Sequence, residues 1–244
     1  MTEEELYKAI SQSQQSLGRG RTLNDAFPVL MRKVYVWMTL ALVITAVTAF
    51  GVATSPALLT AFYSSRALMW GCIIAELALV FILSARLQKL SLTTATFMFI
   101  GYSALNGVML SSIFVMFSPT VITKTFLITA GTFGAMAFVG YTTKKDLSRL
   151  GGILFMALIG LIIASVVNLF LRSSMFDLVV SYIGVAIFVG LTAWDSQRIK
   201  QMLATQYDTS ETAQKLALKG ALTLYLDFIN LFLYLLRIFG RSDN

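Results

Sequence analysis

Seven long apolar segments run through this chain of 244 residues, and they constrain its fold more than any other feature. Each is long enough to cross roughly 30 Å of hydrocarbon at a rise of about 1.5 Å per residue. Backbone groups in lipid need partners within their own segment, and these segments are too long and too uniformly apolar for barrel strands. The sequence therefore predicts an all-α membrane protein with seven transmembrane helices. The segments cover approximately residues 34–54, 67–86, 92–117, 122–143, 150–171, 177–199 and 220–240.

The few charged residues agree with a membrane protein and argue against other classes. They make up 13% of the chain, against about 25% in a soluble domain, and they cluster between the apolar segments. The net charge of +7 is not accompanied by a basic stripe with stacking aromatic residues, so we expect a lipid bilayer and no nucleic acid as the partner. Because the chain has no His, carboxylates are the groups expected to respond to mild pH changes. No cofactor is expected.

The positions of the basic residues predict the domain organisation and the orientation. A polar N-terminal tail (1–33) precedes the membrane domain (34–240), which contains a polar loop (200–219) and leaves a short C-terminus (241–244). We expect the loop to extend the two helices that flank it. With seven spans, the tail and the second, fourth and sixth loops share one side, which then carries 14 of the 19 Lys and Arg residues. The excess of positive charge predicts a cytoplasmic N-terminus and an external C-terminus.

Three acidic residues lie inside the apolar segments: Glu76, Asp195 and Asp227. A carboxylate at membrane depth costs roughly 2.5–3.5 kcal/mol on insertion scales. Each of these groups must therefore face the interior of the bundle, find a partner or keep its proton. They are the residues from which we derive a functional site.

The predicted orientation brings two of these acids to the same depth. Asp195 precedes the cytoplasmic end of the sixth span and Asp227 follows the start of the seventh, so both lie roughly 6–11 Å from that boundary. Helices joined by one loop are usually neighbours, so the two carboxyl groups can meet. Arg86 ends the second span on the same side, and Glu76 lies roughly 15 Å deeper on that helix. Asn230 is one turn beyond Asp227.

Paired carboxylates in a low dielectric suggest a gate. The two groups cannot both ionise cheaply, so the pair shares a proton, and Arg86 could offset its remaining charge. An ionised pair favours a cation with hard oxygen ligands, such as Ca²⁺ held transiently by Asp195 and Asp227. The pattern predicts a proton-sensitive cation gate, with Glu76 lining the path and Asn230 as polar support. The structural alternative is that each aspartate only bonds a neighbouring helix.

Two stretches resemble the Bax inhibitor-1 family, also called the transmembrane Bax-inhibitor-motif family. They are residues 190–198 (GLTAWDSQR) and 221–240 (ALTLYLDFINLFLYLLRIFG), and the resemblance extends over roughly residues 30–240. It implies six helices around a central seventh and a pH-regulated leak of Ca²⁺ across the membrane. It also implies that Asp195 and Asp227 are the pH sensor and that Arg86 is the nearest candidate for an arginine latch. The short C-terminus lacks the basic extension of eukaryotic members, which favours a bacterial inner (plasma) membrane.

Three functions are alternatives to a channel: a modulator of another membrane protein, an intramembrane protease and a retinal-binding pump. A modulator that binds another membrane protein, such as a membrane-bound protease, would use the N-terminal residues 1–25. An intramembrane di-aspartate protease is disfavoured, because the flanks are Trp-Asp-Ser at Asp195 and Leu-Asp-Phe at Asp227 and not Tyr-Asp and Gly-x-Gly-Asp. A retinal-binding pump needs a Lys in the middle of a span, and none of the seven segments has one. We therefore expect a protein that is not an enzyme.

Overall fold

The computed structural model describes residues 3–242, with the side chains of Glu4, Glu5, Lys8 and residues 26–241. Within this part of the chain there is no strand, and seven helices are long and apolar enough to cross a membrane. The predicted all-α protein with seven membrane-spanning helices is confirmed. The elements are α1 (Glu3–Ala53), α2 (Pro56–Ser64), α3 (Arg66–Ala85), η1 (Leu87–Lys89), α4 (Leu92–Leu110), α5 (Ile113–Met116), α6 (Pro119–Thr142), α7 (Ser148–Leu171), α8 (Ser174–Ala204) and α9 (Glu211–Ser242).

The helices continue beyond several of the apolar boundaries expected from the sequence. The apolar part of α1 begins at Ala26, eight residues before the expected start at 34, and the helix itself begins at Glu3. In the 200–219 segment, α8 runs to Ala204 and α9 starts at Glu211, so only residues 205–210 are not helical. Polar residues can continue a helix outside the membrane when their side chains pair along it. The Glu211–Lys215 pair, 2.9 Å apart with i,i+4 spacing, does so at the start of α9.

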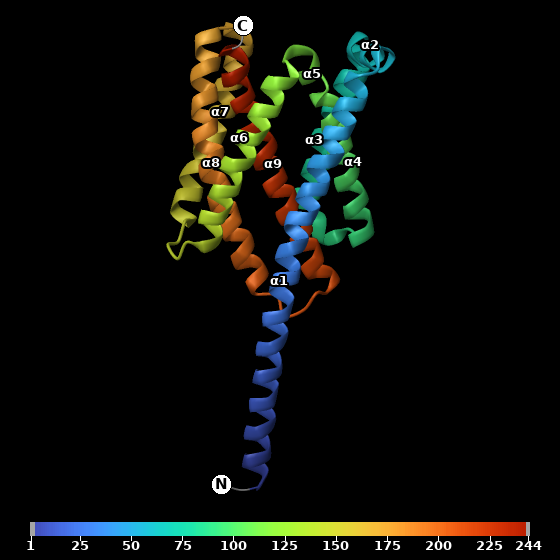
Figure 1. Cartoon of the computed structure of the whole chain (residues 1–244). Coiled ribbons are helices and arrows are strands. Elements are labelled where there is room, and N and C mark those ends of the chain that lie inside the picture. Colours follow the sequence, from blue (N-terminus) through green and yellow to red (C-terminus); the bar gives the residue numbers. More distant parts are fainter. Residues whose placement is uncertain (1–2, 243–244) are drawn as a thin grey trace.

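The connections alternate between the two ends of the bundle (Figure 1). The α3–α4, α6–α7 and α8–α9 connections lie at the end from which the N-terminal part of α1 projects, and the C-terminus, α2 and α5 lie at the other end. Helix α9 is the most buried span and packs on α1, α4, α6 and α8, while α3 packs mainly on α4 and α7 mainly on α8. The expected arrangement of six helices around a central seventh remains a prediction.

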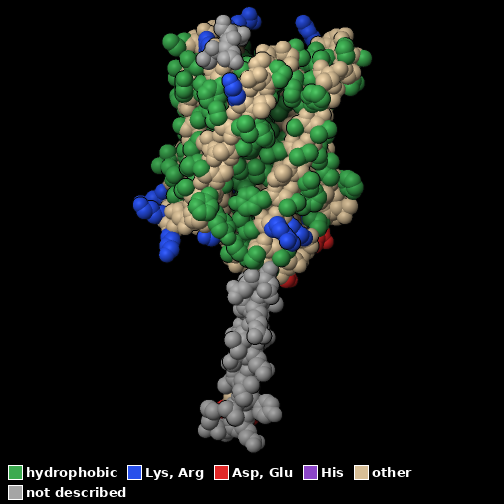
Figure 2. Space-filling model, viewed as in Figure 1, with side chains coloured by type: hydrophobic (Ala, Val, Ile, Leu, Met, Phe, Trp, Pro, Cys, Tyr) green, Lys and Arg blue, Asp and Glu red, His purple; other side chains and the backbone are tan. Residues whose placement is uncertain are grey.

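Lys and Arg side chains gather at the two ends of the molecule, and hydrophobic side chains cover the surface between them (Figure 2). This surface is the one that a membrane-spanning bundle turns toward lipid, because no hydrophobic force drives apolar side chains out of a hydrocarbon medium. The end with the α3–α4, α6–α7 and α8–α9 connections carries most of the Lys and Arg residues of the sequence.

Two glycines allow helices to cross very closely. A Cβ at Gly140 of α6 would lie 2.0 Å from the backbone oxygen of Ala193 in α8. A Cβ at Gly107 of α4 would lie 2.6 Å from the backbone oxygen of Thr45 in α1. Small residues at such crossings let backbones approach and pack by van der Waals contact, the main attraction between helices in lipid. The α6–α8 crossing fixes the part of α8 that carries Asp195.

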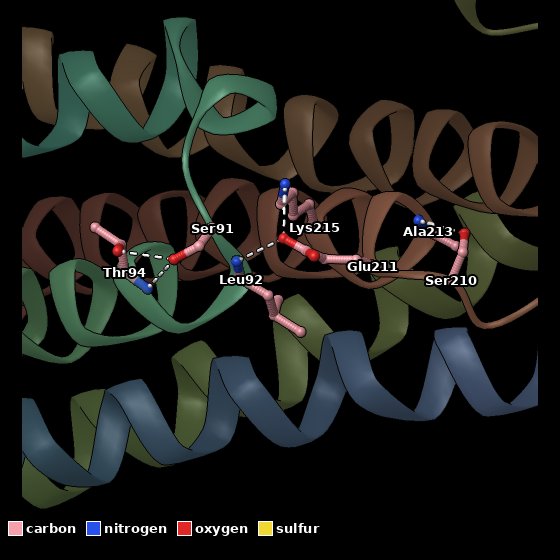
Figure 3. A network of polar contacts seen from close by, with 7 residues as sticks. All are labelled: Ser91, Leu92, Thr94, Ser210, Glu211, Ala213 and Lys215. Atoms are coloured by element: carbon pink, nitrogen blue, oxygen red, sulfur yellow. Dashed lines mark hydrogen bonds and ion pairs between the residues drawn. The ribbon is translucent and has the colours of Figure 1, made fainter.

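Polar contacts hold the ends of α4 and α9 together (Figure 3). The Glu211 carboxylate accepts a hydrogen bond from the backbone N–H of Leu92 (3.0 Å) and pairs with Lys215 (2.9 Å). The Leu92 amide is in the first turn of α4, where N–H groups have no partner within the helix, so a carboxylate is favourable there. On the neighbouring helix, Lys33 Nζ of α1 donates to Gln214 Oε1 at 2.7 Å. These contacts attach the start of α9 to both α4 and α1.

Two connections at this end use the same short turn. The carboxylates of Asp146 and Asp208 accept backbone N–H groups from Ser148 (2.9 Å) and Ser210 (3.1 Å), two residues further on. The serine hydrogen bonds lower the pKa of each carboxyl below its ordinary value, because they stabilise the ionised form. Both groups lie outside the membrane-spanning segments and add fixed negative charges among the basic residues.

Candidate functional site

Asp195 of α8 and Asp227 of α9 meet inside the bundle. Their side chains are 7% and 5% exposed, and the two carboxyl groups are within hydrogen-bonding reach of each other. Among the described residues, no donor reaches Oδ2 of Asp227. A proton carried by one carboxyl satisfies the other, whereas two ionised carboxylates would leave a buried oxygen without a donor. One shared proton would satisfy both carboxyl groups in this geometry.

The pair lies on the wall of a cavity of about 420 Å³ between α7, α8 and α9. Asn230 lines the same cavity one turn beyond Asp227, and its amide donates back to the Leu226 carbonyl at 2.8 Å. A role of Asn230 as polar support for the pair stays a prediction. Arg198 also lines it and interacts electrostatically with Asp195. Apart from Thr223 and Tyr234, the remaining wall is aliphatic and aromatic, so these polar groups are among those that an ion or a water molecule in the cavity would contact.

The residues next to Asp195 fix its position through contacts with other helices. Ser196 Oγ donates to the Ala137 carbonyl of α6 at 2.8 Å. Gln197 spans the α6–α7 connection, since its Nε2 donates to the Lys145 carbonyl (2.8 Å) and its Oε1 accepts from the Leu147 amide (2.9 Å). Such contacts hold the end of α8 against α6 and α7, so the carboxyl of Asp195 is presented from a firmly anchored segment.

Glu76 does not join the aspartate pair. It is half-buried on α3 and accepts a hydrogen bond from Asn106 Nδ2 of α4, and it does not line the cavity of the pair. Its electrostatic influence reaches Tyr225 of α9. Because Tyr225 precedes Asp227 by two residues, about 200° around a helix, the two side chains leave α9 on nearly opposite faces. The structure therefore contains two polar clusters, one on each side of α9.

The second cluster is organised by buried hydroxyl groups. Thr45 Oγ1 of α1 donates to the Ser103 carbonyl of α4 at 2.9 Å, and it lies 2.7 Å from the Tyr225 hydroxyl. Since the Thr45 proton is used on Ser103, the Tyr225 hydroxyl donates to Thr45. These bonds tie α1, α4 and α9 together in the region that Glu76 faces.

Comparison with known proteins identifies the family. The family model described as "Inhibitor of apoptosis-promoting Bax1" matches residues 28–244. The chain belongs to the Bax inhibitor-1 family. Inner membrane protein YbhL of Escherichia coli strain K12 is 53% identical over 213 residues, which are 86% of this chain and 91% of the relative. A protein of Deinococcus radiodurans is 40% identical over 233 residues, 96% of this chain and 99% of that relative.

In this member of the Bax inhibitor-1 family, the cation beside the pair is Arg198 and not Arg86. Arg86 caps the end of α3, and its exposed side chain makes no ion pair or hydrogen bond with any described residue. Arg198 lies over the Trp194 ring, 5.3 Å from its centroid, and shares the cavity with Asp195. Its spacing of three residues from Asp195 on one helix is the signal in the sequence that could have identified it. A latch at Arg86 stays a prediction.

The site has few ligands for a metal ion. Among the described side chains, no three or more His, Cys, Asp or Glu residues lie together so that they could hold one. Asp195 and Asp227 supply carboxylate oxygens, the type that Ca²⁺ prefers, but a stable Ca²⁺ site takes six to eight oxygen ligands. Proton exchange at the pair and Ca²⁺ contact at these residues both stay proposals.

Proposed function

We propose that this Bax inhibitor-1 family member is a pH-sensitive calcium leak channel gated by the proton shared between Asp195 and Asp227. The observation that carries the proposal is the contact of two buried carboxyl groups, from adjacent helices, on the wall of a cavity. A pair that only capped helices would not need to face another acid. Acids at membrane depth typically mark ion or proton pathways.

The protonation state of the pair changes the force between α8 and α9. With one shared proton, the carboxyl groups attract each other and hold the helices together. When the proton leaves, two like charges face each other in a low dielectric, and either the helices separate or a cation compensates the charge. Arg198 supplies part of that compensation from the cavity, and a divalent cation can supply the rest. Glu76, on the other side of α9, adds a third acidic group within the membrane.

The test is Ca²⁺ flux into proteoliposomes from about pH 5 to 8. Asp195→Asn and Asp227→Asn should each flatten the pH dependence, because an amide cannot lose its proton in this range. Asp177→Asn is the matched control: Asp177 is a partly exposed acid in the first turn of α8, 3.8 Å from Arg237 and outside the cavity of the pair. It should keep the wild-type profile. If both pair variants kept the wild-type profile, the gate would lie elsewhere.

Arg198→Gln separates the role of the cation from that of the acids. The ionised pair loses a favourable charge in this variant, so the pH of half-maximal response should move upward. Arg149→Gln, an exposed arginine at the start of α7, is the control and should leave the midpoint unchanged. An unchanged midpoint in Arg198→Gln would remove Arg198 from the gate and leave the aspartate pair to act alone.

We also propose an inner-membrane location with a cytoplasmic N-terminus and an external C-terminus. The proposal rests on the charge asymmetry of the connections and on the inner-membrane relative in Escherichia coli. A reporter that is active only in the cytoplasm should be silent when fused after Asn244. Activity there would contradict the orientation.

The alternative function is regulation of another membrane protein, such as a membrane-bound protease. It is favoured by the N-terminal part of α1, which projects away from the other helices (Figure 1). Deletion of residues 1–25 should abolish co-purification of such a partner and preserve Ca²⁺ flux. The same deletion would abolish flux if the projecting segment belonged to the channel.

A further inference from the structure

A seam between α1 and α6 opens onto the surface of the membrane domain. Both helices pack on α9 and not closely on each other, and α9 is visible between them in Figure 1. The cavities along this seam are lined from both walls. Figure 2 shows the same face covered mainly by hydrophobic side chains, with basic side chains at its ends.

Two cavities follow each other along this seam. The first, of about 280 Å³, lies between the later part of α1 and the early part of α6, with Phe228 and Phe232 of α9 among its lining residues. The second, of about 440 Å³, lies toward the N-terminal end of the α1 span, between Tyr35 and Tyr141. The rings of Phe133 and Phe228, 5.4 Å apart, stand where the two cavities approach each other. We call the two cavities together the α1–α6 groove; they are consecutive hollows along the seam, and these two rings stand between them.

The groove is apolar along its length and basic at one end. Arg32 of α1 lines the second cavity, its side chain is exposed, and it makes no ion pair or hydrogen bond with any described residue. On the opposite wall, Lys200 Nζ lies 5.0 Å from the centre of the Tyr141 ring. A cation without a partner at the end of an apolar groove is complementary to a molecule with an anionic head and a hydrocarbon tail.

A glycine in the wall of the second cavity, Gly134, leaves room for such a tail. Nothing lies within 4 Å of the place where a Cβ of Gly134 would be, and Gly134 lines the second cavity. Gly134 is exposed and lines open space. The close crossing of α6 with α8 occurs at Gly140.

We propose that the α1–α6 groove binds one anionic phospholipid, with its phosphate at Arg32 and an acyl chain along the groove toward Phe228. The lipid belongs to the leaflet that surrounds the N-terminal end of the α1 span. A basic residue near the membrane surface favours anionic over zwitterionic lipids by about fivefold. The acyl chain of the lipid also contacts α9, which carries Asp227. The bound lipid would therefore stiffen the packing of α1 and α6 around that helix.

Native mass spectrometry of the purified protein tests this proposal with phosphatidylglycerol and phosphatidylcholine of identical acyl chains. The wild type should retain one phosphatidylglycerol about fivefold more strongly than phosphatidylcholine. Arg32→Gln should remove the preference, whereas Lys89→Gln, an exposed lysine at the same end outside the groove, should keep it. Ala46→Phe fills the first cavity and should lower retention of both lipids. Ala78→Phe, at an exposed position of α3, is its control.

Equal retention of the two lipids by the wild type, or an unchanged preference in Arg32→Gln, would overturn the proposal. A lipid-free wild-type dimer that Ala46→Phe converts into a monomer would also overturn it, and would assign the groove to a second copy of the chain. None of these outcomes depends on Ca²⁺ flux, so the groove and the aspartate gate are tested separately.

Discussion

The close crossing of α6 and α8 gives a quantitative test of how Asp195 is held. In Gly140→Ala, the new Cβ would lie 2.0 Å from the Ala193 oxygen, where an ordinary contact is at least 3.4 Å. The two helices must therefore separate by about 1.4 Å. The Ser196 hydrogen bond to Ala137, now 2.8 Å, would stretch beyond hydrogen-bonding range. Asp195 is next to Ser196 and should move away from Asp227.

The expected cost is that of overpacking a well-packed interface, about 1–3 kcal/mol. Replacing a helical Gly by Ala also raises the free energy of unfolding by up to about 1 kcal/mol, because Ala has the higher helix propensity. A second Gly-to-Ala variant with the same gain and no clash is therefore the reference. Gly131→Ala serves this purpose, because Gly131 is on the same helix and has nothing within 4 Å of its Cβ position. The difference between the two variants isolates the clash.

Thermal unfolding in detergent, followed by circular dichroism, measures this difference. About 1–3 kcal/mol corresponds to a Tm roughly 2–12 °C lower for Gly140→Ala than for Gly131→Ala in a chain of this size. Gly140→Ala should also weaken the pH dependence of Ca²⁺ flux, while Gly131→Ala should not. Equal Tm values for the two variants would refute the close crossing, and with it the account of how Asp195 is positioned.

Three further predictions concern the polar contacts. Gln197→Ala should lower stability by about 1–3 kcal/mol and speed amide exchange in the α6–α7 connection, whereas Gln201→Ala, exposed on the same helix, should do neither. Tyr225→Phe should cost about 0.5–1.5 kcal/mol in thermal unfolding by removing the bond to Thr45, and the exposed Tyr207→Phe should cost nothing measurable. The Asp208 turn should loosen as the pH falls, because its hydrogen bonds lower the pKa of this carboxyl in the folded state. The stability that they contribute is complete above the ordinary pKa of the carboxyl and is lost as the pH falls through the lowered pKa. A smaller protection factor for exchange of the Ser210 amide at acid pH would show this.

The number of spans and the meeting of the two aspartates could be predicted from the sequence because both depend on local patterns. Hydropathy over about 20 residues identifies a span, and two helices joined by one short connection are usually neighbours. Asp195 and Asp227 lie at equal depth from the boundary at which these two helices are joined, so the prediction that they meet follows. This prediction does not depend on contacts with distant parts of the chain.

Which other side chains surround the aspartate pair depends on packing between distant segments, and the sequence pattern does not predict that packing. Arg86 has the right depth, but α3 packs on α4 and its end stays away from the cavity between α7, α8 and α9. Glu76 likewise faces Asn106 across the α3–α4 contact. Arg198 is one of the 14 basic residues on the predicted cytoplasmic side, and it is also one turn from Asp195 on α8. Depth along one axis does not determine the face on which a helix presents its side chains.

The shared proton itself is the most direct measurement of the central claim. Infrared difference spectroscopy of the protein in bilayers detects the carbonyl band of a protonated carboxyl group as the pH is raised from about 5 to 8. We expect a band that disappears with the same midpoint as the change in Ca²⁺ flux and that is lost or shifted in both Asp195→Asn and Asp227→Asn. A spectrum with no protonated carboxyl that depends on these two residues, or a midpoint different from that of the flux, would contradict the account.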